Sequence, residues 1–311
     1  MPVYKKTKIV IIVLIVCGFL GVSGWYLHHT NIPILEPAGP IALKERNLIY
    51  FALGLSLIVV IPVFGLLGFF AYRYRESNTK AKYSPQLDHS RIAETTWWLI
   101  PSIIIFILAR VAWTSSQTLN PYNPLASSNK TINIQVVALN WLWLFIFPIK
   151  DVASLNNFQI PTNTPINFEI TSDTVMNSFW IPQLGGQIYA MPGMSTQLNL
   201  MASKNGIFNG SSANISGEGF SGMTFAVKAS SYKDYSAWLN GLSKSSKKLN
   251  LKNYNQLAQP SENNAVANYS NVVPNLYNSI IYKYVTPTYG SNGGITTVAI
   301  PRGESLSGMV M

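Results

Sequence analysis

The chain has 311 residues, enough for two or three domains, and its net charge is +10. Half of the basic residues flank apolar runs in the first 114 residues, a pattern typical of membrane topology and not of nucleic-acid binding. The only cysteine is Cys17, and the only histidines are His28, His29 and His89. Residues 115–311 therefore contain no thiolate or imidazole ligands, which excludes ordinary copper, zinc and haem sites in that part of the chain.

Three long apolar runs dominate the first part of the chain. Ile9–Leu27 and Leu48–Tyr72 carry no charge, and Thr95–Trp113 carries only Arg110. Runs of this length match the hydrocarbon core of a bilayer better than a buried core helix. The sequence therefore predicts two or three transmembrane helices.

The first run has two interpretations. Its basic start fits a secretory signal, but its uncharged part is longer than the usual signal core. The residues before Trp25 would suit a lipoprotein signal if a cysteine stood at that position. We therefore expect a retained helix, with a cleaved signal as the alternative.

Basic residues set the predicted orientation. The start of the chain and the loop at 73–93 are rich in Lys and Arg, whereas the loop after the first run has only Lys44 and Arg46. The N-terminus and the 73–93 loop are thus predicted to face the cytoplasm. Everything after about residue 114 is predicted to face a periplasm-like space.

After a Ser-, Asn- and Pro-rich linker at 115–130, apolar and polar residues alternate in short segments. Alternation is found in Ile132–Ala138, Ile166–Ile170, Leu198–Leu200 and Met223–Val227. Short strands separated by Pro, Gly and Asn turns predict a β-sandwich. Beyond residue 230 the pattern loosens, and short helices are expected around Trp238, Tyr254 and Tyr277.

The predicted organisation has five segments: an N-terminal transmembrane helix or signal segment (1–30), a transmembrane hairpin (31–114), a β-sandwich (115–230), a helical extension (231–286) and a disordered Gly-, Ser- and Thr-rich tail (287–311).

An aromatic cluster at Asn140–Pro148 is too dense for an ordinary surface strand. It favours a core strand with some exposed rings that dock on a partner or on the bilayer edge. A site that receives electrons is the alternative, which the lack of metal ligands in this part of the chain disfavours.

The loop Ser211–Met223, with its glycine steps and final methionine, has the outline of a metal site. Soft metals bind thiolates and imidazoles, whereas Ser212, Ser216 and Phe220 stand where such ligands would be. We expect Phe220 to fill the place of an imidazole as an apolar plug.

These features together resemble subunit II of the haem–copper respiratory oxidases. In the cytochrome c branch of that family, a dicopper centre is held by the pattern Cys-x3-Cys-x3-His-x2-Met and an upstream histidine. Here the cysteine positions hold Ser212 and Ser216, the histidine positions hold Phe220 and Asn177, and only Met223 is retained. The resemblance implies a cupredoxin-like sandwich that lacks metal.

The chain is similar, over about residues 30–285, to the quinol-oxidase branch of the cytochrome bo type. Beyond the loop, the matching phrases are Ala81–Pro85, Gln187–Met191, Pro260–Glu262 and Tyr269–Val272, while Met176–Pro182 belongs to the wider resemblance to subunit II. Trp25 is a departure, because related subunits carry a lipidated cysteine there.

The resemblance implies subunit II of a proton-pumping ubiquinol oxidase, an oxidoreductase of the bacterial inner membrane. Subunit I would oxidise quinol and reduce oxygen to water at its own haems and copper, so no cofactor is expected in this chain. The implied partners are subunit I, other oxidase subunits and the membrane, and no nucleic acid. The alternatives are a membrane-tethered cupredoxin-like scaffold or binding protein and, against the missing ligands, subunit II of a cytochrome c oxidase.

Glu94 is the one residue with a predicted catalytic role. Ser90 is a predicted N-cap, which puts Glu94 in the first turn of the third helix, where the dipole stabilises a carboxylate without further function. Acids at membrane depth also mark proton paths. The resemblance places a glutamate here, just before Trp97, Trp98 and Pro101, at the mouth of a proton channel into subunit I.

Overall fold

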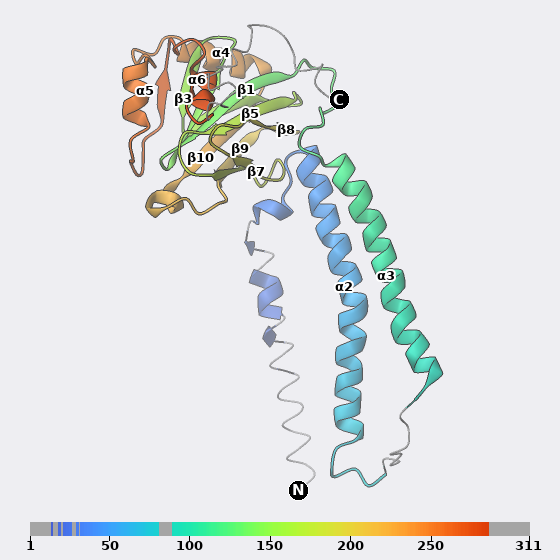
Figure 1. The fold of residues 1–311 in the computed structure, drawn as a ribbon. Coiled ribbons are helices and arrows are strands. Elements are labelled where there is room, and N and C mark those ends of the chain that lie inside the picture. The colour runs from blue at the N-terminus through green and yellow to red at the C-terminus, as the bar shows by residue number, and fades with distance from the viewer. Residues whose placement is uncertain are drawn as a thin grey trace, which may run out of the picture.

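The computed structural model describes residues 32–80 and 89–285, together with residues 14, 18, 19, 21–26, 29 and 30 of the first apolar run. In it, a long helical hairpin carries a β-domain at one end (Figure 1). The predictions for most of the first run and for the tail at 287–311 lie outside the described residues.

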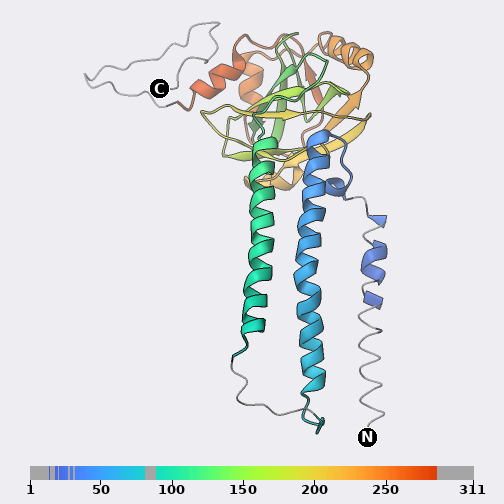
Figure 2. The same ribbon diagram turned by 90° about the vertical axis from the view of Figure 1, so that its right-hand side faces the viewer.

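The hairpin consists of α2 (Pro40–Arg73) and α3 (Arg91–Thr118), preceded by a short 3-10 helix, η1 (Pro33–Leu35). Both long helices are apolar enough to cross a membrane, and no part of their most apolar stretches is buried within the chain. They run side by side away from the β-domain (Figure 2). The two transmembrane helices predicted for this region are therefore confirmed as helices.

The start of α3 follows the predicted capping. The Ser90 hydroxyl accepts a hydrogen bond from the Ala93 N–H at 3.4 Å. The end differs from the prediction, since α3 continues to Thr118, so the residues directly after 114 are helical and do not belong to the linker.

The β-domain is a sandwich of two sheets. The first sheet has the strand order β11 (Ala267–Tyr269), β3 (Val152–Leu155), β2 (Leu142–Phe147), β1 (Ile132–Leu139), β5 (Ile166–Ser172) and β8 (Thr196–Leu200). The second has the order β4 (Asn157–Pro161), β10 (Thr224–Ser230), β9 (Gly206–Ser212), β6 (Asn177–Trp180) and β7 (Ile188–Ala190). The four strands predicted from alternation, β1, β5, β8 and β10, are all present.

Aromatic rings fill the space between the sheets. Phe179 of β6 stacks on Phe225 of β10 with ring centroids 5.0 Å apart, and Trp143 of β2 meets Phe179 edge-on at 5.3 Å. A second core lies on the other face of the first sheet, where Leu142 and Leu144 pack beneath the C-terminal helices.

Burial of β2 on both faces confirms the core strand expected in the aromatic cluster and corrects the expectation of exposed rings on it. All six residues of β2 are buried, so its rings do not dock on a partner. A strand covered on both faces reads as a continuous apolar run without alternation, which is why the cluster looked too apolar for a half-exposed strand.

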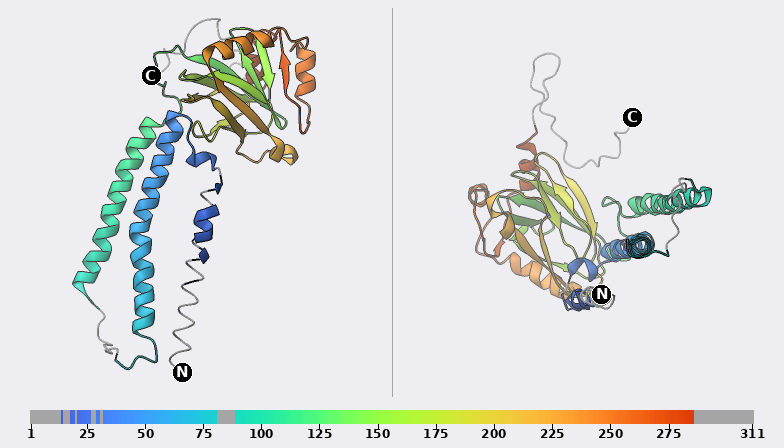
Figure 3. Two further views of the ribbon diagram at one scale, coloured as in Figure 1. Left: turned by 180° about the vertical axis from the view of Figure 1, so that it is seen from behind. Right: turned by 90° about the horizontal axis from the view of Figure 1, so that it is seen from below.

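The C-terminal extension contains α4 (Tyr232–Leu242), α5 (Leu251–Leu257) and α6 (Leu276–Tyr282), at the positions expected from the sequence. It also supplies β11, which extends the first sheet beside β3 and was not predicted. Seen from below, the hairpin lies to one side of the sandwich, so most of the sandwich extends sideways beyond the hairpin (Figure 3).

Candidate functional site

The loop that resembles a copper site connects β9 to β10 through a 3-10 turn, η2 (Glu218–Gly222). At its start the Ser212 hydroxyl donates to the Asn177 side-chain oxygen at 3.1 Å, and both residues are buried. The Ser212 N–H also donates to the Met223 carbonyl at 3.0 Å. Two of the former ligand positions are therefore joined directly by a neutral hydrogen bond.

The other residues of the ligand pattern lie in different surroundings. Met223 is buried in the core between the sheets. The Ser216 hydroxyl is buried and has no hydrogen-bond partner among the described residues. Phe220 is only partly buried. The structure thus brings together Asn177, Ser212 and the backbone of Met223, but does not seal Phe220 into the core.

The Trp141 side chain packs closely against this loop. Its ring lies against the loop so closely that a Cβ on Gly219 would come within 2.6 Å of it. Its indole N–H donates to the Ser216 carbonyl at 3.1 Å. Phe220 is partly buried and thus less enclosed than the predicted plug, whereas Trp141, with a left-handed φ of 62°, packs against the loop.

The side chains of this loop do not fit a dicopper centre. Hydroxyl, amide and phenyl groups are not ligands of soft metals, and Met223 supplies the only sulfur. Among the residues that the structure describes, no three His, Cys, Asp or Glu side chains are close enough to hold a metal ion.

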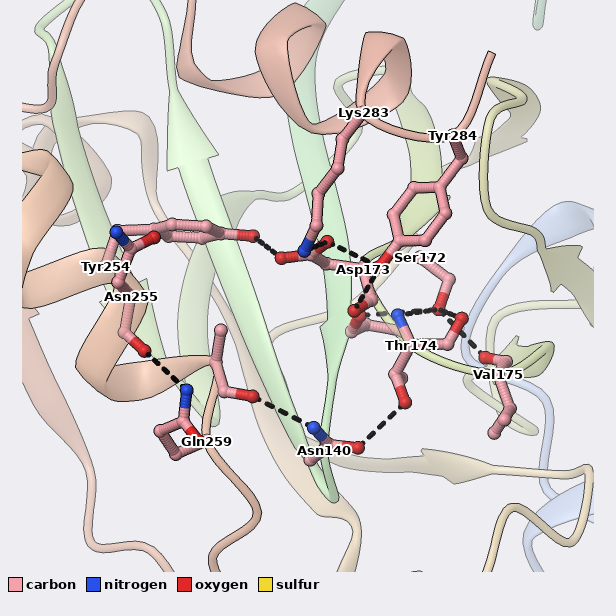
Figure 4. Close-up of polar contacts among 12 residues, drawn as sticks. Asn140, Ser172, Asp173, Thr174, Val175, Tyr254, Asn255, Gln259, Lys283 and Tyr284 are labelled. Atoms are coloured by element: carbon pink, nitrogen blue, oxygen red, sulfur yellow. Dashed lines mark hydrogen bonds and ion pairs between the residues drawn. The ribbon is translucent and has the colours of Figure 1, made fainter. Parts of the chain in front are cut away.

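A second polar site, not anticipated from the sequence, lies directly after β5 (Figure 4). The Asp173 side chain is fully buried, with 0% of its surface exposed. It accepts hydrogen bonds from the Tyr254 hydroxyl at 2.6 Å, the Lys283 ammonium at 2.7 Å and the Tyr284 hydroxyl at 2.8 Å. We call these four residues the Asp173 latch, because they tie the C-terminal extension to the sandwich.

Electrostatics favours the protonated forms of the donors in the Asp173 latch. The pKa of Lys283 is raised, chiefly because its ammonium donates to the Asp173 carboxylate. The pKa of Tyr254 is raised by burial first, and then by its hydrogen bond to Asp173. The latch is therefore an ion pair reinforced by two neutral hydroxyl donors.

The segment between Asp173 and Asn177 connects the latch to the loop. The Thr174 hydroxyl donates to the Asn140 side-chain oxygen at 2.7 Å, and the Asn140 amide donates to the Ala258 carbonyl at 2.9 Å (Figure 4). The Asn177 amide in turn donates to the Val175 carbonyl at 3.0 Å. The segment 173–177 is thus hydrogen-bonded, directly or through Asn140, to the C-terminal extension, and it also contains Asn177.

Glu94 lies far from these groups, in the first turn of α3 at the end of the hairpin remote from the sandwich. Its carboxylate is 3.5 Å from the His89 imidazole, and 42% of its side-chain surface is exposed. This carboxylate is therefore accessible from outside the chain.

Two family models match this chain. The model of the cytochrome c oxidase subunit II periplasmic domain matches residues 133–230, and the COX Aromatic Rich Motif matches residues 244–288. The second match covers the extension that supplies Tyr254, Lys283 and Tyr284 to the Asp173 latch.

The chain is 48% identical to cytochrome bo(3) ubiquinol oxidase subunit 2 of Pseudomonas putida, over 86% of this chain and 84% of that one. It is 46% identical to ubiquinol oxidase subunit 2 of Acetobacter aceti, over 84% and 86%. The solved periplasmic domain of cytochrome oxidase subunit II of Bradyrhizobium japonicum is 20% identical and covers 38% of this chain and 94% of its own, with a TM-score of 0.35, too low to add to the argument. On the strength of the first two relatives, the chain belongs to the ubiquinol oxidase subunit 2 family.

Proposed function

We propose that this chain is the metal-free subunit II of a proton-pumping ubiquinol oxidase, whose subunit I oxidises ubiquinol and reduces oxygen to water at its own haems and copper. The observation that carries the proposal is the Ser212–Asn177 hydrogen bond. Neutral side chains thus occupy two positions where a dicopper centre would need ligands, which supports a role without electron transfer through this loop.

The proposed role of the hairpin is to bind subunit I within the inner membrane, with the sandwich on the periplasmic side. The basic residues Arg73, Arg75, Lys80 and Arg91 lie around the turn between α2 and α3, at the end remote from the sandwich, which favours a cytoplasmic position for that turn. The part of the sandwich that extends beyond the hairpin is proposed to cap and stabilise a neighbouring subunit.

Glu94 is proposed to take up protons for subunit I. A carboxylate that passes protons inward must reach water, and the half-exposed side chain of Glu94, near the turn proposed to be cytoplasmic, is accessible to it. A purely structural residue at this helix start would contribute only the interaction with the helix dipole, about 0.3–1 kcal/mol.

Glu94→Gln tests this proposal in the assembled oxidase. We expect intact assembly and haem content, slower quinol-driven oxygen consumption per haem, and partial recovery with Glu94→Asp, because only the carboxylates can carry the proton. Glu76→Gln is the matched control, since Glu76 is an exposed acid near the same turn, and it should leave turnover unchanged. Unchanged turnover in Glu94→Gln would return Glu94 to a structural role.

A further inference from the structure

The junction between the hairpin and the sandwich is rigidly built. The Ala38 N–H donates to the Gln183 carbonyl at 2.7 Å, and the Ala42 N–H, in the first turn of α2, donates to the Leu184 carbonyl at 3.2 Å. Gly39 packs so tightly that a Cβ would lie 2.4 Å from the Met201 carbonyl oxygen. The cavities at this junction therefore have defined walls.

Two cavities adjoin at the junction, and they differ in character. The first, of about 580 Å³, is mainly apolar, and its walls include Ile34, Ala42, Leu48, Ile49, Trp180 and Pro182. The second, of about 430 Å³, is more polar, and its walls include Lys44, Asn120, Asn123 and Asn199. Glu45, Gly186 and Gln187 line both. Glu45 thus stands at the boundary between an apolar and a polar cavity.

Glu45 is a carboxylate without a cationic partner. It is half-buried and lies beside Gly186, but among the described residues it forms no ion pair. A charge that has lost part of its water is stabilised by an opposite charge nearby. Lys44, the adjacent residue, is exposed and lines the polar cavity.

The depth of the cavities matches the head-group layer of a bilayer. The uncharged run of α2 begins at Leu48, directly after Lys44, Glu45 and Arg46, so these charges lie where the helix would leave the hydrocarbon core. Leu48 and Ile49 belong both to that run and to the wall of the apolar cavity.

We propose that the two cavities bind one phospholipid with a primary-amine head group, of the ethanolamine type. Its ammonium group donates to Glu45, its phosphate lies toward Lys44 in the polar cavity, and the start of an acyl chain occupies the apolar cavity. Glu45 repels an anionic head group that carries no ammonium. A choline head group lacks the N–H donors that would bond to the carboxylate.

Native mass spectrometry of the purified, delipidated full-length chain, in the assembly in which it is extracted, tests this site. The probes are phosphatidylethanolamine, phosphatidylcholine and phosphatidylglycerol with identical acyl chains, and bound lipid is counted per copy of this chain. We expect phosphatidylethanolamine to bind best, and Glu45→Gln to weaken it about tenfold, the effect of losing one charge-assisted hydrogen bond. Glu36→Gln, an exposed acid outside both cavities, should bind as the wild type does.

Ile49→Trp is a second variant that fills the apolar cavity and keeps the carboxylate. It should reduce the binding of all three lipids without changing their order. Equal binding of the three lipids by the wild type, or unchanged phosphatidylethanolamine binding in Glu45→Gln, would overturn the proposal. So would loss of a partner subunit in Glu45→Gln with lipid binding unchanged, because Glu45 would then pair with a basic side chain of that subunit.

Discussion

In the sandwich, Trp143, Phe145 and Phe179 are fully buried between two facing sheets, whereas in the hairpin Phe64 and Trp98 remain 68% and 73% exposed. The sandwich closes its own core on both faces of the first sheet. The hairpin contacts the sandwich at one end. The most apolar stretches of α2 and α3 are not buried by the described residues.

This difference in burial indicates that the sandwich is stabilised by its own contacts, whereas the hairpin serves to contact the membrane and other subunits. The sandwich has the buried contacts of an independent domain and hydrogen bonds where a metal would otherwise be. The described residues leave the hairpin's apolar surface uncovered, as expected of a surface that meets lipid or another membrane segment. Residues after Thr118 should therefore fold without the hairpin, and association with partners should depend on the hairpin.

The largest loss of stability in the sandwich is expected from a substitution in its aromatic core. Phe179→Ala should lower the free energy of unfolding of the isolated sandwich by about 3–5 kcal/mol, because it opens a cavity among stacked rings. Ile207→Ala, at an exposed position of β9, should change it by less than about 0.5 kcal/mol. Chemical denaturation measures both, and equal losses would mean that the ring cluster is not the source of stability.

The next largest effect is expected from the Asp173 latch. Asp173→Asn removes the acceptor charge of three hydrogen bonds and should cost about 2–3 kcal/mol, with Lys283 adding little because its side chain is mostly in water. Asp151→Asn is the control, since Asp151 is exposed and has a left-handed backbone that asparagine also adopts. Faster hydrogen exchange in α5 and α6 of Asp173→Asn alone would identify release of the extension.

The same latch gives a pH signature. The pKa values of Lys283 and Tyr254 are raised in the folded state. Their contribution to the free energy of unfolding is therefore complete below about pH 10, the ordinary pKa, and is lost as the pH rises toward the folded-state pKa values. Stability of the wild-type sandwich should fall above about pH 10, and less so in Asp173→Asn. A fall of equal size in both proteins would assign the pH effect to other tyrosines.

A smaller effect is expected at the former copper loop. Gly219→Ala should cost about 1–3 kcal/mol, because its methyl group would overlap the Trp141 ring. Gly222→Ala is the matched control, since its methyl group would meet only the side-chain oxygen of Asn263 at 3.2 Å. If both variants were equally stable, Trp141 would not be the group that fills the loop.

Local patterns explain what could be predicted from the sequence. Long apolar runs identified α2 and α3, and alternation identified β1, β5, β8 and β10, because both signals lie within a few neighbouring residues. The replaced ligands at Ser212, Ser216 and Phe220 could likewise be read directly.

The features that the sequence did not predict depend on contacts between residues far apart in the chain. Asp173 meets Tyr254 and Lys283 only after the extension has folded back over the sheet, and no local pattern marks such a meeting. Trp141 could be assigned to the aromatic cluster but not to the loop, since its position depends on an unusual backbone angle. The short β11 is stabilised by pairing with β3, not by its own residues.

The most direct test of the division between the two regions is purification from membranes, with matched affinity tags, of the full chain and of a chain that begins after Thr118. The account predicts that the full chain brings down a haem-bearing partner, measured by absorbance per copy of the tagged chain, and that the shorter chain is folded but carries no haem. A full chain that purifies without a haem-bearing partner, or a sandwich that retains the partner without the hairpin, would contradict it.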